Sequence, residues 1–199
     1  MLTSPISSFF CPTRIHLGIG AHTHLASVLQ GYDCQRLFIA LDRALQGGDF
    51  YQRIEAILAE QNIATAVFTD IEADPSDTTV ERAFAVCRAH NATAILAVGG
   101  GSTMDVAKAV GILATNGGRI HDYEGIEKFS KPPLPLIAIP TTAGTGSEVS
   151  GSCVISDTTR HLKMSIRHAA LNPAAVAILD PLALVTMPGH VAAHSGLDA

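Results

Sequence analysis

Short apolar runs rich in Ile, Val, Leu and Phe alternate along this sequence with longer segments of helical period. This alternation is typical of parallel strands, because each parallel pair needs a long return connection and a helix supplies it. We therefore predict an α/β fold in which a parallel sheet carries helices on both faces. The apolar runs place its strands at residues 36–41, 64–68, 94–98, 136–139 and 176–179.

The segments between these runs predict three helices, at residues 51–60, 77–89 and 103–114. In the second helix, apolar residues recur at the i, i+3, i+4, i+7 spacing of a buried face, behind the N-cap candidates Ser76 and Asp77. Residues 153–166 differ, because two short runs flank a polar segment at 157–160. That pattern predicts an inserted β-hairpin.

Composition limits the classes of partner and compartment. Apolar residues make up 47% of the 199 residues and charged residues 16%, so the chain can bury a core of one domain or slightly more. The formal net charge of −5 argues against nucleic acid or an anionic membrane as a partner. No apolar run approaches the roughly 20 residues that cross a bilayer. The four cysteines are widely spaced without a C-x-x-C pair, so we expect free thiols in a reducing cytoplasm.

The last residues predict a helix that begins at Pro188 and reaches the end of the sequence without a stop signal. We therefore expect the chain to stop inside a helix. His190, His194 and Asp198 recur at a spacing of four residues and share one helix face. Two imidazoles and a carboxylate can ligate a metal, but the same spacing also occurs on an ordinary solvated face.

A glycine-rich turn, residues 99–102, follows the strand at 94–98 and opens a helix. Glycines allow close approach of the backbone to a phosphate, and a helix N-terminus offers unpaired N–H groups and partial positive charge. The turn matches neither the G-x-G-x-x-G nor the Walker pattern. A phosphate cradle and a tight strand-to-helix turn are equally compatible with it.

Two other polar positions follow strands. Residues 141–148, dense in Thr, Ser and Gly, come after the strand at 136–139, and Asp42 comes after the strand at 36–41. Loops at the carboxyl ends of parallel strands border the ligand crevice, where a carboxylate can bind a ribose diol and repel a 2′-phosphate. Taken singly, Asp42 also fits a solvated turn, and Lys163 in the hairpin also fits a surface lysine.

Taken together, these segments resemble the iron-containing (group III, metal-dependent) alcohol dehydrogenases of the dehydroquinate synthase-like superfamily. The matching motifs follow the family order over nearly the whole chain: residues 17–21, 99–108 (Gly-Gly-Gly-Ser-Thr-Met-Asp-Val-Ala-Lys), 139–149 (Ile-Pro-Thr-Thr-Ala-Gly-Thr-Gly-Ser-Glu-Val), Asn172-Pro173, Asp180-Pro181 and 196–199 (Gly-Leu-Asp-Ala). The resemblance implies a Rossmann-like dinucleotide-binding domain at residues 1–185. Residues 186–199 would then be the first helix of an all-helical metal and substrate domain.

The resemblance also implies roles for single residues. Asp42 would bind the adenosine ribose and favour NAD over NADP, and Gly100, Gly101 and Ser102 would cradle the pyrophosphate. The other implied cofactor residues are Asp105 in the motif's acidic position, Thr141, Thr142, Thr145 and Ser147 along the ribose path, Lys163 at the nicotinamide ribose and Leu182 near the adenine. Asp74 stands where the family often has Asn. Asp198 matches the first ligand of Fe²⁺ or Zn²⁺, whereas His190 and His194 match no family ligand.

The implied reaction is hydride transfer between the nicotinamide and the carbinol carbon of a small alcohol or aldehyde, with a divalent metal polarising the substrate oxygen. With one of four ligands, we expect this chain alone to be inactive. Two alternatives share the nucleotide domain: a maleylacetate reductase-like or synthase-like enzyme, and a stand-alone non-catalytic nucleotide-binding module. A homodimer is compatible with the sequence.

Overall fold

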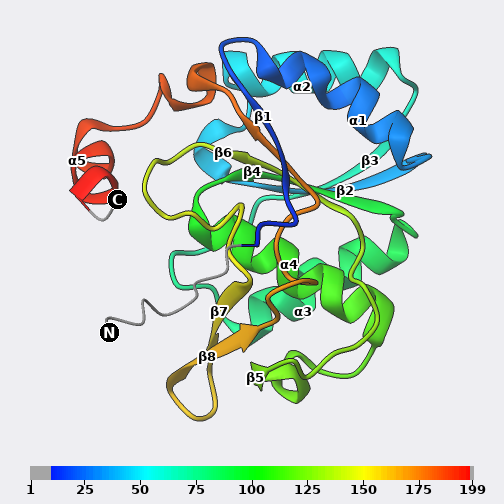
Figure 1. Ribbon diagram of the computed structural model, residues 1–199, viewed down its shortest axis with the longest axis vertical. Coiled ribbons are helices and arrows are strands. Elements are labelled where there is room, and N and C mark those ends of the chain that lie inside the picture. Colours follow the sequence, from blue (N-terminus) through cyan, green and yellow to red (C-terminus); the bar gives the residue numbers. More distant parts are fainter. Residues whose placement is uncertain (1–9, 198–199) are drawn as a thin grey trace, which may run out of the picture.

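A computed structural model describes residues 10–197 and contains a six-stranded sheet in which every neighbouring pair is parallel. The strand order is β1-β9-β6-β4-β2-β3 (Figure 1). The strands are β1 (Arg14–Leu17), β2 (Arg36–Leu41), β3 (Ala64–Phe68), β4 (Ala94–Gly99), β6 (Leu136–Pro140) and β9 (Val176–Leu179). The five strands predicted from apolar runs are thereby confirmed, with β4 and β6 each extended by one residue.

Helices cover both faces of this sheet, as predicted. Helices α1 (Leu25–Gly31) and α2 (Asp49–Glu60) lie above it in Figure 1, and α3 (Asp77–Ala89) and α4 (Gly101–Asn116) lie below it. The three predicted helices correspond to α2, α3 and α4. Both α2 and α4 begin two residues earlier than the sequence pattern indicated.

Strand residues alternate between two apolar layers because successive side chains point to opposite faces of a sheet. From β2, Leu37 and Ile39 pack with α1 and α2, whereas Phe38 and Ala40 pack with α3 and α4. All six residues of β4 are buried, which explains its uninterrupted apolar run. The core therefore fixes the central strands and, with them, the loops at their carboxyl ends.

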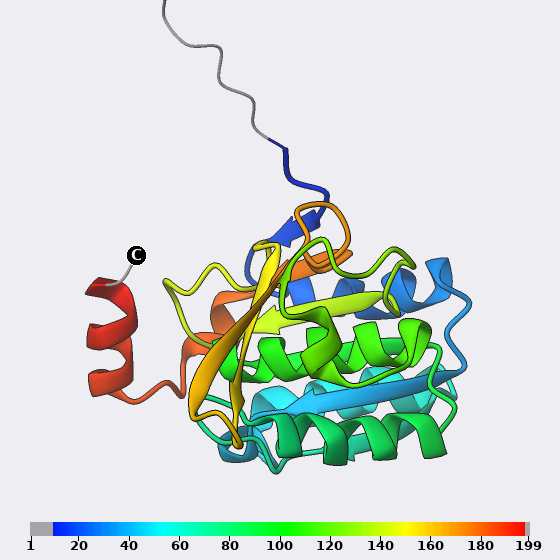
Figure 2. The same cartoon turned by 90° about the horizontal axis from the view of Figure 1, so that it is seen from below.

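The predicted hairpin is confirmed as β7 (Ser152–Asp157) and β8 (Leu162–Arg167), which pair antiparallel. A two-residue strand, β5 (Gly125–Ile126), adds to β8 in parallel and completes a small second sheet. Figure 2 shows the hairpin (yellow to orange) lying across the ends of the main layers. Within residues 10–197, four short 3-10 helices connect larger elements: η1 (Ala21–His24), η2 (Arg43–Leu45), η3 (Ile120–Tyr123) and η4 (Pro181–Leu184).

A final helix, α5 (Gly189–Leu197), confirms the helix predicted after Pro188. None of its described side chains is buried, and both views show it standing apart from the sheet layers (Figures 1 and 2). Across residues 10–197, no helix has the length and apolarity to cross a membrane. Cys11, Cys34, Cys87 and Cys153 are all free thiols.

Candidate functional site

Three of the predicted site segments meet at neighbouring strand ends. The Asp42 N–H donates to the Val98 carbonyl at 2.9 Å, and the Thr141 N–H donates to the Gly99 carbonyl at 3.0 Å. The ends of β2, β4 and β6 are therefore joined in one row. The chain passes from β2 outward to β3 and returns to β4 on the other side of β2, so this row contains the topological switch point where α/β sheets bind ligands.

The glycine turn is packed tightly against its surroundings. A Cβ on Gly99 would lie 2.7 Å from Cβ of Thr103, so only glycine fits there. A Cβ on Gly100 would lie 3.1 Å from Oγ1 of Thr142, which brings the threonine-rich loop directly against the turn. A Cβ on Gly101 would meet nothing closer than 3.6 Å, so a side chain here would project toward the loop without a backbone clash.

Helix α4 begins at this turn with Gly100 as its N-cap, and no side chain within the described residues caps it. The first N–H groups and the positive end of the helix dipole are thus available to an anion. Ser102, in the first turn, is half-buried. Beside the turn, the Oγ1 atom of Thr142 is buried and has no hydrogen-bond partner among residues 10–197. A buried hydroxyl of this kind is costly unless a ligand or water pairs with it.

A cavity of about 200 Å³ opens between the threonine-rich loop and the end of β9. Thr142 is one of its lining residues. The others come from the ends of β1, β6 and β9 and the segments that follow them: Leu17, Pro140, Ala143, Gly144, Gly146, Glu148, Leu179, Asp180, Pro181 and Leu184. The wall is largely apolar with few polar groups, the usual composition of a small-molecule pocket.

Asp42 is half-buried and is the N-cap of η2, accepting from the Ala44 N–H at 3.0 Å through Oδ1. Within residues 10–197, no donor is bonded to its Oδ2. The cap fixes the carboxylate at the end of β2 and leaves the second oxygen for another donor.

The Asp105 carboxylate is hydrogen-bonded to the threonine-rich loop and to β7. It accepts from the Ser147 Oγ at 3.2 Å and from the Val154 N–H at 3.1 Å. Burial raises the pKa of Asp105 above its ordinary value, against the lowering effect of these bonds and of the nearby Lys108 charge. The Thr145 Oγ1 in turn accepts from the Ser147 N–H at 3.4 Å. The structure thus joins Asp105, Thr145 and Ser147 in one network that shapes the loop.

The remaining predicted cofactor residues lie farther out. The Lys163 Nζ, in the hairpin, forms an exposed ion pair with Oδ1 of Asp74 at 2.7 Å. Leu182, in η4, packs against the core on the α1 and α2 side of the sheet and does not line the cavity. Thr141 is buried at the end of β6. Asp198 lies outside the described residues, and His190 and His194 are both exposed on α5.

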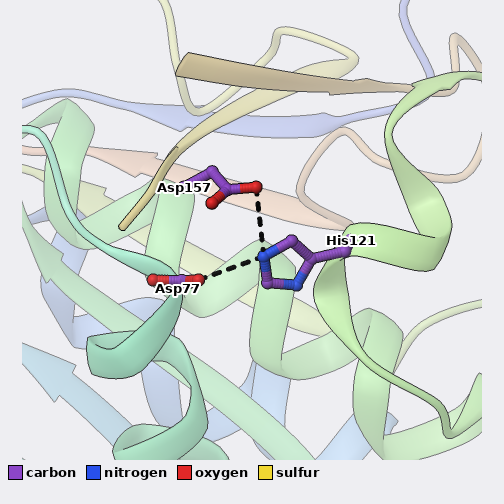
Figure 3. A group of neighbouring side chains, drawn as sticks. All are labelled: Asp77, His121 and Asp157. Atoms are coloured by element: carbon purple, nitrogen blue, oxygen red, sulfur yellow. Dashed lines mark ion pairs between the residues drawn. The ribbon is translucent and has the colours of Figure 1, made fainter. Parts of the chain in front are cut away.

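The sequence reasoning missed a cluster that holds the hairpin in place. The Nε2 atom of His121 lies 3.0 Å from Oδ2 of Asp77 and 3.4 Å from Oδ2 of Asp157 (Figure 3). These residues come from η3, the start of α3 and the end of β7. Their sequence positions are far apart, so no local pattern indicated the cluster.

Asp157 in this cluster also forms an ion pair with Arg160. The Arg160 Nε donates to the same Oδ2 of Asp157, and the other oxygen of Asp157 accepts from the Thr159 and Arg160 N–H groups at 2.8 Å. The backbone and side-chain bonds from Arg160 lower the pKa of Asp157 to about 2. The Oδ1 of Asp77 accepts from the Thr158 N–H of the hairpin turn at 3.3 Å, so the cluster joins the hairpin to the start of α3.

Comparison with known proteins agrees with this geometry. Residues 12–181 match the sequence profile described as iron-containing alcohol dehydrogenase. A relative, the NAD-dependent methanol dehydrogenase of Bacillus methanolicus, is 36% identical over 194 residues, which cover 98% of this chain and 51% of that protein. The chain spans about half the length of the curated relatives it matches.

Solved structures give the same result. A crystal structure of 1,3-propanediol oxidoreductase superposes with a TM-score of 0.92 at 32% identity, over 98% of this chain and 50% of that one. Sulfoacetaldehyde reductase from Bifidobacterium kashiwanohense, solved in complex with NAD+, superposes with a TM-score of 0.86 at 28% identity, over 98% of this chain and 51% of that one. The Rossmann-like fold and the profile match together show that the chain belongs to the iron-containing alcohol dehydrogenase family.

Proposed function

We propose that this chain forms the dinucleotide-binding part of an oxidoreductase that interconverts an alcohol and an aldehyde or ketone. The observation that carries the proposal is the proximity of Thr142 to the Gly100 turn, where an added Cβ would meet its hydroxyl. It sets an uncapped helix N-terminus beside a buried hydroxyl that has no partner in residues 10–197. A pyrophosphate would satisfy both, because it accepts from backbone N–H groups and from hydroxyls.

Within this proposal the residues divide by the part of the cofactor that they bind. Gly100, Gly101 and Ser102 bind the pyrophosphate, and Asp42 accepts from the adenosine ribose hydroxyls. Thr141, Thr142, Thr145 and Ser147 border the path between the two ribose rings. Lys163 and Leu182 are assigned to the nicotinamide ribose and the adenine by resemblance alone.

The cofactor is proposed to be NAD rather than NADP, because the carboxylate of Asp42 would repel a 2′-phosphate. The family is iron-containing, and we propose Fe²⁺ or Zn²⁺ as its metal, with Asp198 as one ligand. Residues 1–185 are proposed as the dinucleotide domain and 186–199 as the start of a helical metal and substrate domain. The absence of buried side chains among the described residues of α5 supports this division.

When bound, the nicotinamide accepts or supplies hydride at C4, and the divalent metal polarises the substrate oxygen as a Lewis acid. This chain's own contribution is to hold the dinucleotide at the ends of β2, β4 and β6. A small alcohol or aldehyde is the proposed substrate, in line with the methanol dehydrogenase and the 1,3-propanediol oxidoreductase that the chain resembles. The homodimer and the cytoplasmic location stay predictions from the sequence.

The test is fluorescence titration of the chain with NADH. Gly101→Val should raise the dissociation constant by about a hundredfold or more, since its side chain would occupy the path of the pyrophosphate. Gly31→Val is the matched control, because a Cβ at Gly31, at the end of α1, meets nothing within 4 Å. Equal NADH affinity in Gly101→Val and the wild type, with both folded by circular dichroism, would contradict the proposed site.

A further inference from the structure

Lys108 is a charged residue buried in the middle of α4, with 2% of its surface exposed. Its Nζ donates to the Ser150 carbonyl at 2.9 Å, to the Ser152 carbonyl at 2.8 Å and to the Ser150 Oγ at 3.3 Å. An ammonium group has three N–H donors, so three acceptors satisfy it fully. Burial lowers the pKa of Lys108, and the nearby Cys153, Asp105 and Glu148 oppose that effect.

The acceptors of Lys108 lie on the chain that connects the threonine-rich loop to the hairpin. The Ser150 N–H donates back to the Gly146 carbonyl inside the loop at 3.0 Å, and Ser152 is the first residue of β7. Lys108 therefore binds the segment after the loop through two backbone carbonyls. Because these acceptors are backbone atoms, side-chain substitutions at Ser150 and Ser152 would not remove them.

Asp105 holds the same segment from one turn earlier in α4. Its carboxylate accepts from Ser147 before the Lys108 contacts and from Val154 after them. Asp105 and Lys108 thus both hydrogen-bond to residues 147–154, which connect the loop to the hairpin. Because the glycine turn is the N-terminus of the same helix, α4 sets the spacing between the turn and the loop.

We propose that Lys108 is a positioning residue of the dinucleotide site, which acts without touching the cofactor by fixing the threonine-rich loop against the Gly100 turn. This inference rests on the proposed function, since it concerns the same site. Loss of the ammonium would remove the Lys108 donor from the Ser150 carbonyl and would leave the Ser152 carbonyl only the Ser150 Oγ, which donates to it at 3.3 Å. The segment 147–154 would have to move to pair the Ser150 carbonyl with water.

The test compares Lys108→Met, which keeps an unbranched apolar stem and removes the donors, with Ile112→Val and Ile112→Ala. Ile112 is fully buried one turn later in α4, and its aliphatic side chain offers no hydrogen-bond donor to the loop carbonyls, so its two variants lower stability in graded steps without removing a hydrogen bond. We expect the NADH dissociation constant to rise at least about tenfold in Lys108→Met. The Ile112 variant of matched melting temperature should stay within about threefold of the wild type.

Amide hydrogen exchange without ligand gives a second measurement. Exchange over residues 147–154 should be faster by about tenfold or more in Lys108→Met than in the Ile112 variant of matched melting temperature. If Lys108→Met does not fold, Lys108→Gln replaces it in the test, because glutamine keeps an amide N–H₂ group. It should raise the NADH dissociation constant and the exchange rate by smaller factors.

The positioning role would be overturned if exchange over residues 147–154 in Lys108→Met were no faster than in the Ile112 variant of matched melting temperature. It would also be overturned if the NADH dissociation constant rose equally in both variants. Wild-type NADH affinity in folded Lys108→Met would also overturn it. A wild-type chain that does not bind NADH would instead contradict the proposed function, and the exchange comparison would still decide whether Lys108 fixes the loop.

Discussion

The Nδ1 atom of His22 lies 2.5 Å from Oδ2 of Asp180, and both side chains are almost completely buried. The same carboxylate accepts from the Gly20, His22 and Leu182 N–H groups at 3.0 to 3.2 Å. It therefore ties the segment after β1 to the end of β9, beside the cavity that Asp180 lines. Burial acts to raise the pKa of Asp180, but these hydrogen bonds outweigh it and hold the pKa below its ordinary value.

Asp180→Asn should destabilise the fold by about 2 to 4 kcal/mol, because an amide replaces a buried carboxylate that accepts four bonds. The pKa of Asp180 is depressed on folding, so its ionised form contributes stability that is complete above the unfolded pKa of about 3.9 and is lost as pH falls further. Urea unfolding from pH 7 to pH 3 should show the two proteins converging below about pH 4. A stability difference that does not change with pH would contradict this role for the charge.

Asp42→Asn should narrow the preference for NADH over NADPH by about tenfold, since it removes the negative charge that would repel a 2′-phosphate. Asparagine can still cap η2 as Asp42 does, so the loop should keep its shape. Parallel titrations with both cofactors measure the ratio. Equal or tighter NADPH binding by the wild type would show that Asp42 does not select the cofactor.

The chain should bind Zn²⁺ or Fe²⁺ no more tightly than about 100 μM, since a divalent metal site needs about three protein ligands and the resemblance assigns only Asp198 here. The rival is the three-ligand site that the sequence spacing of His190, His194 and Asp198 predicts. Calorimetric titration of the chain with zinc distinguishes weak binding from a real site at these three residues. Micromolar binding that disappears in His190→Ala would establish the rival site, and His161→Ala, an exposed histidine in the hairpin turn, is the control.

The sequence predicted the central elements well because their burial is nearly uniform. Residues 94–99 of β4 are all buried, and such a strand is visible as one apolar run. The edge strand β1 was missed, since Ile15 and Leu17 are exposed and a partly exposed strand has no such run. Helix α1 was also not predicted, although Leu25, Val28 and Leu29 have the helical spacing of a buried face and are all buried.

Site contacts were harder to predict than site segments. Glycine and threonine loops after strands are local patterns, and the closeness of Gly100 and Thr142 follows from adjacent parallel strands. The pair His22 and Asp180, by contrast, is separated by 158 positions, and no periodicity connects residues at that range. The direction of Asp105 toward Val154 also depends on where the hairpin packs, which the sequence pattern does not specify.

The central claim, that a dinucleotide binds across the ends of β2, β4 and β6, is tested most directly by NMR of the isotope-labelled chain during titration with NADH. We predict that the largest amide shift changes fall at Asp42, at residues 100–102 and at residues 141–147, with little change in the Asp77, His121 and Asp157 cluster. Saturable changes confined to another surface, or no changes at millimolar NADH, would contradict the account.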